Sequence, residues 1–191
     1  MGHRVGRVLI TGEEIAGRIQ ELAGAVAHDY AEKDPVLVGV LKGAVVFLAD
    51  LIRAADIPIT LDFVELSSYG AGTGSSGLVE IISDLSGSIE NRHVLIVEDI
   101  IDTGRTAHYL RRNLESRHPA SLRLCALLNK AGRREIVVEI DYVGFTIPNE
   151  FVVGYGLDFM AHYRNLPYIA VLEPEPAGPE PGGSLALQDL E

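Results

Sequence analysis

The stretch Val94-Leu-Ile-Val-Glu-Asp-Ile-Ile-Asp-Thr-Gly-Arg-Thr106 decides the fold of this 191-residue chain. Its first four residues are apolar throughout, which predicts a strand buried on both faces. Two acids and two isoleucines follow, and then Asp102-Thr-Gly-Arg-Thr106 at the expected start of a helix. A strand, a glycine-containing turn and a helix start together make an anion site, because free N–H groups at the helix N-terminus point outward and the helix dipole favours negative charge.

The turn has a simpler interpretation as well, in which Asp102 or Thr103 only caps the helix. The adjacent acids Glu98 and Asp99 favour a ligand instead, because open α/β sheets bind ligands at the carboxyl ends of their strands. An unpaired acidic pair there costs stability unless it meets a sugar hydroxyl or a metal. A Walker phosphate loop is excluded, since the chain contains no Gly-Lys-Ser/Thr sequence.

Predicted strands and helices alternate along the rest of the chain. We expect strands at 36–41, 59–66, 78–82, 94–97, 121–128 and 142–145. We expect helices from a capping box at Thr11–Glu14 to about residue 31, from Gly43 to before Pro58, and from 103 to about 116. Apolar strands that alternate with helices indicate an α/β domain with a parallel sheet of about five strands, covered on both faces.

Two segments do not fit this packed pattern. Residues 67–77 contain four glycines and four serines, which predicts a mobile loop. The segment that starts at Glu173 is acidic and rich in proline and glycine, so we expect residues 173–191 to form a disordered tail. The packed domain then spans about residues 8–172.

Composition narrows the classes of function. The chain is 47% hydrophobic but has no apolar run long enough to cross a membrane, and its N-terminus does not resemble a secretory signal. Its single cysteine, Cys125, lies in an apolar run and predicts a buried core residue in a reducing, cytoplasmic setting. The net charge of −11 opposes nucleic-acid binding but leaves a small anionic substrate open.

The pattern of two hydrophobic residues, two acids, two hydrophobic residues and Asp-Thr-Gly-x-Thr resembles the signature of the type I phosphoribosyltransferases. That resemblance implies that Glu98 and Asp99 hold the ribose 2′- and 3′-hydroxyls of phosphoribosyl pyrophosphate. It also implies that the 5′-phosphate is cradled by Asp102, Thr103, Gly104, Arg105 and Thr106. Asp102 is then the candidate general base, which takes a proton from the purine ring.

The likeness extends from about Val8 to Leu172 and is strongest to bacterial hypoxanthine (hypoxanthine-guanine) phosphoribosyltransferases. Val38-Gly-Val-Leu-Lys-Gly-Ala44 resembles the family's pyrophosphate loop, in which Leu41–Lys42 would be a cis peptide next to Gly43. Ser68 and Tyr69 resemble the start of the family's flexible loop, which closes over the reacting centre and excludes water.

Two later segments, Phe145 to Asp158 and Tyr163 to Tyr168, resemble the purine and metal end of the family's site. The resemblance implies that Phe151 stacks on the base, that the Val152 backbone meets the base edge, and that Arg164 contacts pyrophosphate. It makes Asp158 the ligand for Mg²⁺, with Glu98 and Asp99 as further metal contacts, whether direct or only through the ribose hydroxyls. Lys130 would donate to a 6-oxo group, which selects against adenine because adenine presents a donor there.

These features predict a type I phosphoribosyltransferase fold, with a small hood made from the N-terminal segment and the residues after about 145. The expected reaction joins hypoxanthine or guanine to phosphoribosyl pyrophosphate, giving IMP or GMP, in a homodimer or homotetramer. A xanthine-preferring transferase and a nucleotide-sensing RNA-binding regulator of the same fold are the alternatives. The chain departs from the family pattern at Asn129 and Ala131, in place of Asp and Pro, and at Glu80 and Ser83, in place of lysines.

Overall fold

The computed structural model describes residues 3–68 and 79–175. A six-stranded sheet forms its centre, in the order β4-β3-β2-β5-β6-β7. Its strands are β2 (Val36–Leu41), β3 (Thr60–Ser68), β4 (Val79–Ser83), β5 (His93–Ile101), β6 (Ser121–Asn129) and β7 (Tyr142–Thr146). Five of them run parallel and β4 pairs antiparallel with β3, so the expected mainly parallel sheet is confirmed.

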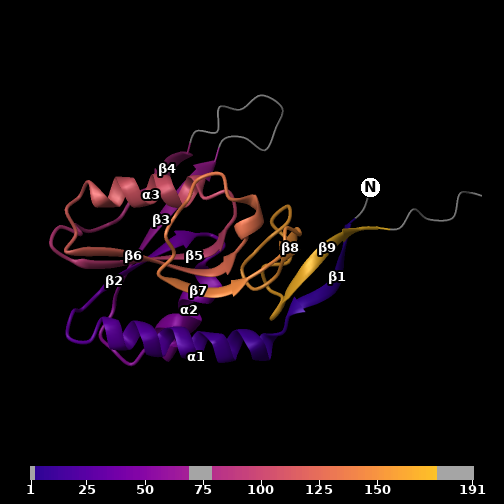
Figure 1. The fold of residues 1–191 in the computed structure, drawn as a ribbon, viewed down its shortest axis with the longest axis horizontal. Helices are drawn as coiled ribbons and strands as arrows, with labels where there is room; N and C mark the ends of the chain where they lie inside the picture. Colours follow the sequence, from indigo (N-terminus) through magenta and orange to yellow (C-terminus); the bar gives the residue numbers. More distant parts are fainter. Residues whose placement is uncertain (1–2, 69–78, 176–191) are drawn as a thin grey trace, which may run out of the picture.

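Helices cover both faces of this sheet (Figure 1). α1 (Gly12–Asp29) and α2 (Val45–Ala54) bury apolar residues in one core cluster, while α3 (Arg105–Glu115) buries its inner face in the other. The predicted capping box is present, because Thr11 Oγ1 accepts from Glu14 N and Glu14 Oε2 accepts from Thr11 N. The period-3.6 pattern therefore located all three helices, to within a few residues at their ends.

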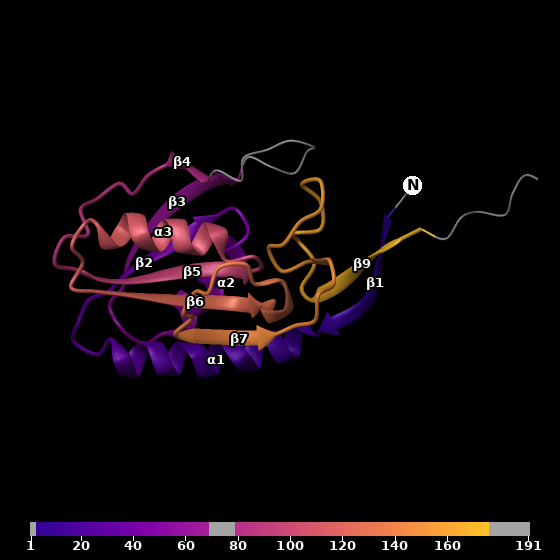
Figure 2. The ribbon, with the colours of Figure 1, turned by 45° about the horizontal axis from the view of Figure 1, so that its top comes forward.

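A small second sheet lies beyond the carboxyl ends of the central strands (Figures 1 and 2). It contains β1 (His3–Ile10), β9 (Ile169–Pro174) and β8 (Val152–Val153), all antiparallel, in the order β1-β9-β8. This sheet is the expected hood.

The boundary between hood and tail differs from the prediction. Glu173 belongs to β9, where it pairs with Arg4 across the sheet and forms an ion pair of 3.1 Å with the Arg4 guanidinium. The backbone pairing with β1 continues as far as Pro174, which explains why two residues of tail-like composition are ordered. Residues 176–191 of the predicted tail lie outside the described residues. So do residues 69–77 of the predicted loop, including Tyr69, and Leu78, the first residue of the next predicted strand.

β5 is longer than its apolar run predicts. Glu98, Ile100 and Ile101 all remain paired with β6, so the strand continues through the two acids. Cys125 lies opposite Val97 in the same ladder and is fully buried, and burial raises the pKa of its thiol to about 12. The prediction that Cys125 is a core residue is confirmed. No helix in the described ranges is long and apolar enough to span a membrane.

Candidate active site

Of the acid pair of β5, Glu98 is buried and Asp99 is partly buried. Glu98 is only 5% exposed. The Asp99 carboxylate lies against Gly43, where an added Cβ would stand 1.6 Å from Asp99 Oδ2. Burial raises the pKa of Glu98 well above its usual value, and the charge of Asp99 raises it further. Burial also raises the pKa of Asp99 to about 6, against a hydrogen bond from Ile100 N. A hydroxyl or a cation at this pair would relieve the cost of burying two carboxylates.

The turn after β5 presents backbone N–H groups. Gly104 is the N-cap of α3, with φ at +86°, and it has no side chain to cap the helix. The hydroxyl of Thr103, one residue earlier, accepts a long hydrogen bond of 3.4 Å from Arg105 N. The simpler interpretation of the turn therefore holds in part for Thr103, although neither Thr103 nor Asp102 is the N-cap residue. A side chain at position 104 would collide, because its Cβ would lie 2.3 Å from the Ile136 carbonyl oxygen. A cavity of about 80 Å³ opens here, lined by residues that include Glu98, Ile101, Asp102, Thr103, Gly104 and Thr106. Free N–H groups at the positive end of a helix suit a phosphate.

Asp102 stands near several cations. Its Oδ2 lies 3.4 Å from Arg133 Nη1, and its Oδ1 is buried without a hydrogen-bond partner among the described residues. Lys130 is only 5% exposed, and burial lowers the pKa of its ammonium while the charge of Asp102 opposes that shift. A buried acceptor and a buried donor therefore lie within electrostatic reach of each other. A heterocycle that offers one N–H and one carbonyl would satisfy both.

Main-chain hydrogen bonds fasten the segment after β6 to this turn. Lys130 N donates to Ile101 O at 3.0 Å. Thr103 O accepts from both Glu135 N and Ile136 N, at 2.9 and 3.0 Å. The segment that carries Lys130 and the turn that starts at Asp102 are therefore positioned together, although about thirty residues separate them in the sequence.

Three charged residues of this segment have no predicted role, yet they contact the site. Arg133 pairs with Asp102, Arg134 donates to the Asn129 side chain, and Glu135 pairs with the side chain of Arg105. Runs of charged residues after a strand are common on protein surfaces. For that reason the sequence carries no specific signal that could have identified them.

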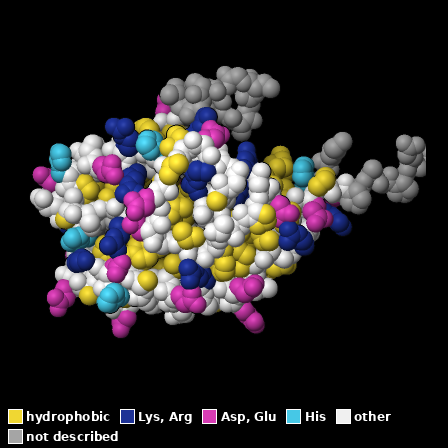
Figure 3. Space-filling model, viewed as in Figure 1, with side chains coloured by type: hydrophobic (Ala, Val, Ile, Leu, Met, Phe, Trp, Pro, Cys, Tyr) yellow, Lys and Arg dark blue, Asp and Glu magenta, His cyan; other side chains and the backbone are white. Residues whose placement is uncertain are grey.

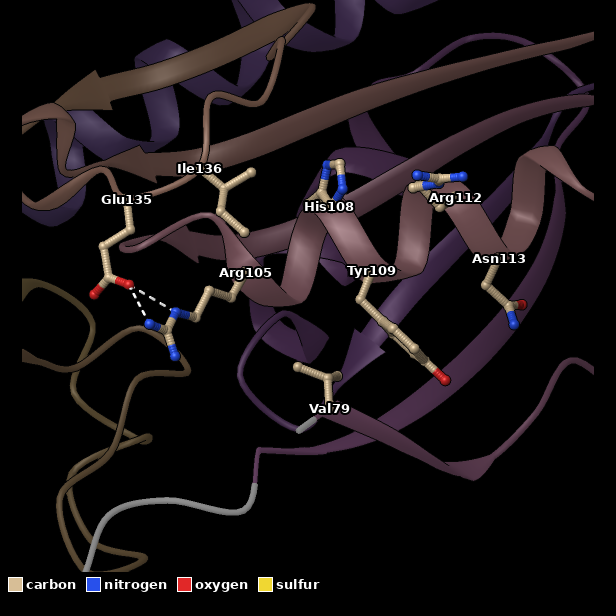
Figure 4. Close-up of a pocket in the computed structure, with 8 residues that line it drawn as sticks. All are labelled: Val79, Arg105, His108, Tyr109, Arg112, Asn113, Glu135 and Ile136. Atoms are coloured by element: carbon tan, nitrogen blue, oxygen red, sulfur yellow. Dashed lines mark hydrogen bonds and ion pairs between the residues drawn. The ribbon is translucent and has the colours of Figure 1, made fainter. Parts of the chain in front are cut away.

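The guanidinium of Arg105 points toward the carboxylate of Glu135 (Figure 4). Its Nη2 lies 2.6 Å from Glu135 Oε2, and its Nε donates to the same oxygen at 2.7 Å. This ion pair borders a groove of about 770 Å³ on the outer side of α3. The groove is also lined by Val79, His108, Tyr109, Arg112, Asn113 and Ile136. The groove shares only Arg105 with the predicted site.

The segment after β2 reaches the acid pair from the other side. Its Leu41–Lys42 peptide is cis, as the resemblance implies. The exposed Lys42 ammonium lies 3.8 Å from Glu65 Oε1. The carbonyl oxygen of Gly43 fills the space next to Gly156, where an added Cβ would lie only 2.1 Å away. The central sheet and the hood therefore meet at Gly43.

Asp158 and Arg164 form the hood side of this meeting point. Asp158 Oδ1 lies 2.7 Å from Arg164 Nη2, and Asp158 Oδ2 accepts from Ala161 N at 2.8 Å. Besides burial, the pKa of Asp99 responds to both, since Arg164 lowers it and Asp158 raises it. The described residues contain no cluster of three or more His, Cys, Asp or Glu suited to a metal. Mg²⁺ commonly takes only one or two carboxylates, with phosphate oxygens and water completing its shell, so Asp158 and Asp99 fit as its protein contacts.

The remaining predicted residues lie on the hood or at its border. Phe151 is 53% exposed, with its ring edge-on to Phe159 at a centroid distance of 5.6 Å. Val152 is buried in β8, where it pairs with Val171 at the edge of the hood sheet. Phe151 thus offers an open aromatic face for stacking. Ser68 is the last residue of β3. Tyr69, which was predicted to act together with Ser68 in the flexible loop, lies outside the described residues.

A sequence model of the phosphoribosyl transferase domain family matches residues 9–160 of the chain. The chain belongs to this family. The matched range includes the turn from Asp102 to Thr106 and the two acids before it.

Individual relatives cover almost all of this phosphoribosyltransferase. A hypoxanthine-guanine phosphoribosyltransferase of Streptococcus pneumoniae is 48% identical over 171 residues, which are 90% of this chain and 95% of the relative. A crystal structure of a hypoxanthine phosphoribosyltransferase from Staphylococcus aureus superposes with a TM-score of 0.86 at 48% identity, covering 90% of this chain and 93% of that one. A bifunctional TilS/HprT protein of Listeria innocua is 50% identical over 175 residues. The match covers 92% of this chain but only 27% of that longer protein.

Replacement of Glu98 by Gln should stabilise the protein, and increasingly so at higher pH. The folded-state pKa of Glu98 lies above its unfolded value, so ionisation of this group opposes folding as the pH rises through that interval. We expect the free energy of unfolding of Glu98→Gln to exceed that of the wild type by roughly 1–3 kcal/mol at pH 8, and by much less at pH 4. Urea unfolding at several pH values measures the difference. The exposed Glu90→Gln is the control, and a difference independent of pH would contradict the assignment.

Proposed function

We propose that this protein transfers the 5-phosphoribosyl group from phosphoribosyl pyrophosphate to hypoxanthine or guanine, giving IMP or GMP and pyrophosphate. One observation carries the proposal: the buried Lys130 lies near the Asp102 carboxylate, one oxygen of which has no partner among the described residues. The backbone of Lys130 is hydrogen-bonded to Ile101, directly before the phosphate-binding turn. Lys130 can only donate, and ionised Asp102 can only accept. That pair matches the 6-oxo group and a ring N–H of a 6-oxopurine.

The residues divide the work between two substrates. The N–H groups from Thr103 to Thr106 hold the 5′-phosphate, and the acids Glu98 and Asp99 accept hydrogen bonds from the ribose hydroxyls. Phe151 stacks on the base from the hood. The base is then fixed against ribose C1, which removes much of the entropic barrier to reaction.

Asp102 carries the proton transfer. As the purine nitrogen bonds to C1 and the bond from C1 to pyrophosphate breaks, the ring loses a proton, which the Asp102 carboxylate accepts. Bound Mg²⁺ supplies Lewis-acid stabilisation of the pyrophosphate leaving group. Asp158 and Asp99 would hold that ion. The departing pyrophosphate would face Arg164 and the segment after β2, in which Lys42 follows the cis peptide bond and Gly43 comes next.

The proposal includes a cytoplasmic location, which suits a chain with one buried and unpaired cysteine. It also includes assembly as a homodimer or homotetramer, on the family resemblance alone. A regulator that binds RNA would need a continuous basic face. On the face shown in Figure 3, basic and acidic side chains of the described residues are interspersed instead, and the chain carries a net charge of −11.

The direct test is to mix the protein with phosphoribosyl pyrophosphate, Mg²⁺ and one purine at a time. IMP from hypoxanthine or GMP from guanine is the expected product, and adenine should give no AMP. Formation of XMP alone would favour the xanthine-preferring alternative. No nucleotide from either hypoxanthine or guanine would overturn the proposal.

Asp102→Asn should lower kcat by about 10²–10⁴-fold, because the amide keeps the shape of the side chain but cannot accept the proton. Binding of phosphoribosyl pyrophosphate, measured by calorimetry, should stay within about threefold of the wild type, since backbone N–H groups hold the phosphate. Normal turnover by Asp102→Asn would remove Asp102 from the role of general base.

Lys130→Ala should raise the KM for hypoxanthine by roughly 10–100-fold, the cost of one charge-assisted hydrogen bond. The KM for phosphoribosyl pyrophosphate should change by less than about threefold. The exposed Lys33→Ala, on the far side of the domain, controls for loss of a positive charge. Equal increases for both substrates would show that Lys130 supports the site generally and does not select the purine.

A further inference from the structure

Tyr155 connects the hood to the central domain through a buried hydroxyl. The residue is only 7% exposed, and its hydroxyl donates to Asp50 Oδ2 on α2. Asp50 also pairs with Arg53 on the same helix. Burial, and next the bond to Asp50, raise the pKa of the Tyr155 hydroxyl far above its usual value, so the hydroxyl remains a donor. This bond links residues 105 positions apart in the sequence.

The backbone around Tyr155 has little freedom to move. Tyr155 adopts a φ of +50° between Gly154 at +100° and Gly156 at +98°, a conformation that a tyrosine rarely takes without tertiary support. Tyr155 N donates to Leu166 O at 2.9 Å, and Gly156 N donates to Arg164 O at 3.0 Å. The turn is therefore pinned by its own main chain on one side and by the Tyr155 hydroxyl on the other.

The same turn contacts Gly43 and Arg164, two of the residues proposed to face pyrophosphate. The Gly156 backbone lies against the Gly43 carbonyl, and Gly43 in turn lies against Asp99. Gly156 O accepts from Arg164 Nη1 at 2.6 Å, while Arg164 Nη2 lies 2.7 Å from Asp158. A displacement of Gly156 would thus move Arg164 and alter the contact with Gly43 at the same time.

We propose that Tyr155 is a positioning residue for phosphoribosyl pyrophosphate. Its hydroxyl, anchored on Asp50, holds Gly156 against Gly43 and so sets Arg164 and Asp158 in register with the segment after β2. The inference rests on the proposed function. It predicts that loss of the Tyr155 hydroxyl weakens the binding of phosphoribosyl pyrophosphate and leaves the binding of the purine nearly unchanged. Lys130 is held by its own bond to Ile101 and by the segment it belongs to, none of which involves the Tyr155 turn.

The chain contains a matched control in Tyr142. This residue is also 7% exposed, and its hydroxyl donates to Asp29, which pairs with Arg123 just as Asp50 pairs with Arg53. Tyr142 stands at the amino end of β7, whereas the hood lies beyond the carboxyl end (Figure 2). Tyr142→Phe and Tyr155→Phe therefore each remove one hydroxyl bond to a carboxylate, at opposite ends of the sheet. Tyr142→Phe also removes the bond that this hydroxyl accepts from Arg123 Nη1 at 2.7 Å, so it is the more severe of the two changes.

The experiment measures KM for both substrates, kcat and the melting temperature of the full chain in each variant. Tyr155→Phe should raise the KM for phosphoribosyl pyrophosphate roughly tenfold and the KM for hypoxanthine by less than about twofold. Asp50→Ala should reproduce this pattern. Asp50→Asn, which keeps an oxygen acceptor, should recover most of the loss. Tyr142→Phe should lower the melting temperature at least as much and leave both KM values within about twofold.

Three results would overturn the proposal: an unchanged KM for phosphoribosyl pyrophosphate in Tyr155→Phe, equal increases for both substrates, or the same increase in Tyr142→Phe. If the wild type forms no nucleotide from any purine, it is the proposed function that has failed. Calorimetric titration of Mg²⁺ and phosphoribosyl pyrophosphate into the wild type and the two Tyr→Phe variants then tests positioning alone. Weaker binding only in Tyr155→Phe supports it, and equal binding in all three refutes it.

Discussion

The Gly43 backbone passes so close to the Asp99 carboxylate that no side chain fits between them. This closeness follows from the parallel ladder between β2 and β5, which pairs Gly39 with Val97 and releases both strands at the same edge of the sheet. On its other side the Gly43 carbonyl fills the space next to Gly156 in the hood. One glycine therefore sets the spacing between the acid pair, the segment after β2 and the hood. Any larger residue would separate all three.

The second constraint is electrostatic. Glu98 stays in the ladder with β6, opposite Ala126, and its side chain is buried there. The chain accepts a destabilising acid pair at the one edge where a ligand can compensate it, a trade common at functional sites. Arg164 near Asp99 lessens the cost without neutralising the pair.

Much of this arrangement could be predicted from local sequence. The apolar run before Glu98 gave the central strand, and the Thr11–Glu14 capping box located α1, because these signals depend only on neighbouring residues. The pairing of β1 with β9 could not be predicted in the same way. The residues His3-Arg-Val-Gly-Arg-Val-Leu-Ile10 lack a clean alternation, and their register depends on a partner more than 150 residues away.

The same limit applied to the site. Lys130, Phe151 and Asp158 were expected only by resemblance, since each alone is an ordinary residue. The contacts of Arg133, Glu135 and Tyr155 had no local signal at all, because they depend on which turns the fold brings together. Spacing along the chain indicates elements and their faces, while contacts between distant turns need the assembled structure.

The pairing of His3 with Pro174 has a consequence for how the protein is made. All six strands of the central sheet are present once Thr146 has been synthesised, but the hood needs the first and the last described strands at once. During translation the β1 segment has no partner until β9 emerges, more than 150 residues later. A nascent chain that ends before β9 already carries Phe151, Asp158 and Arg164, but it lacks the strand that joins β1 to β8 in the hood sheet. Completion of the hood therefore waits for β9.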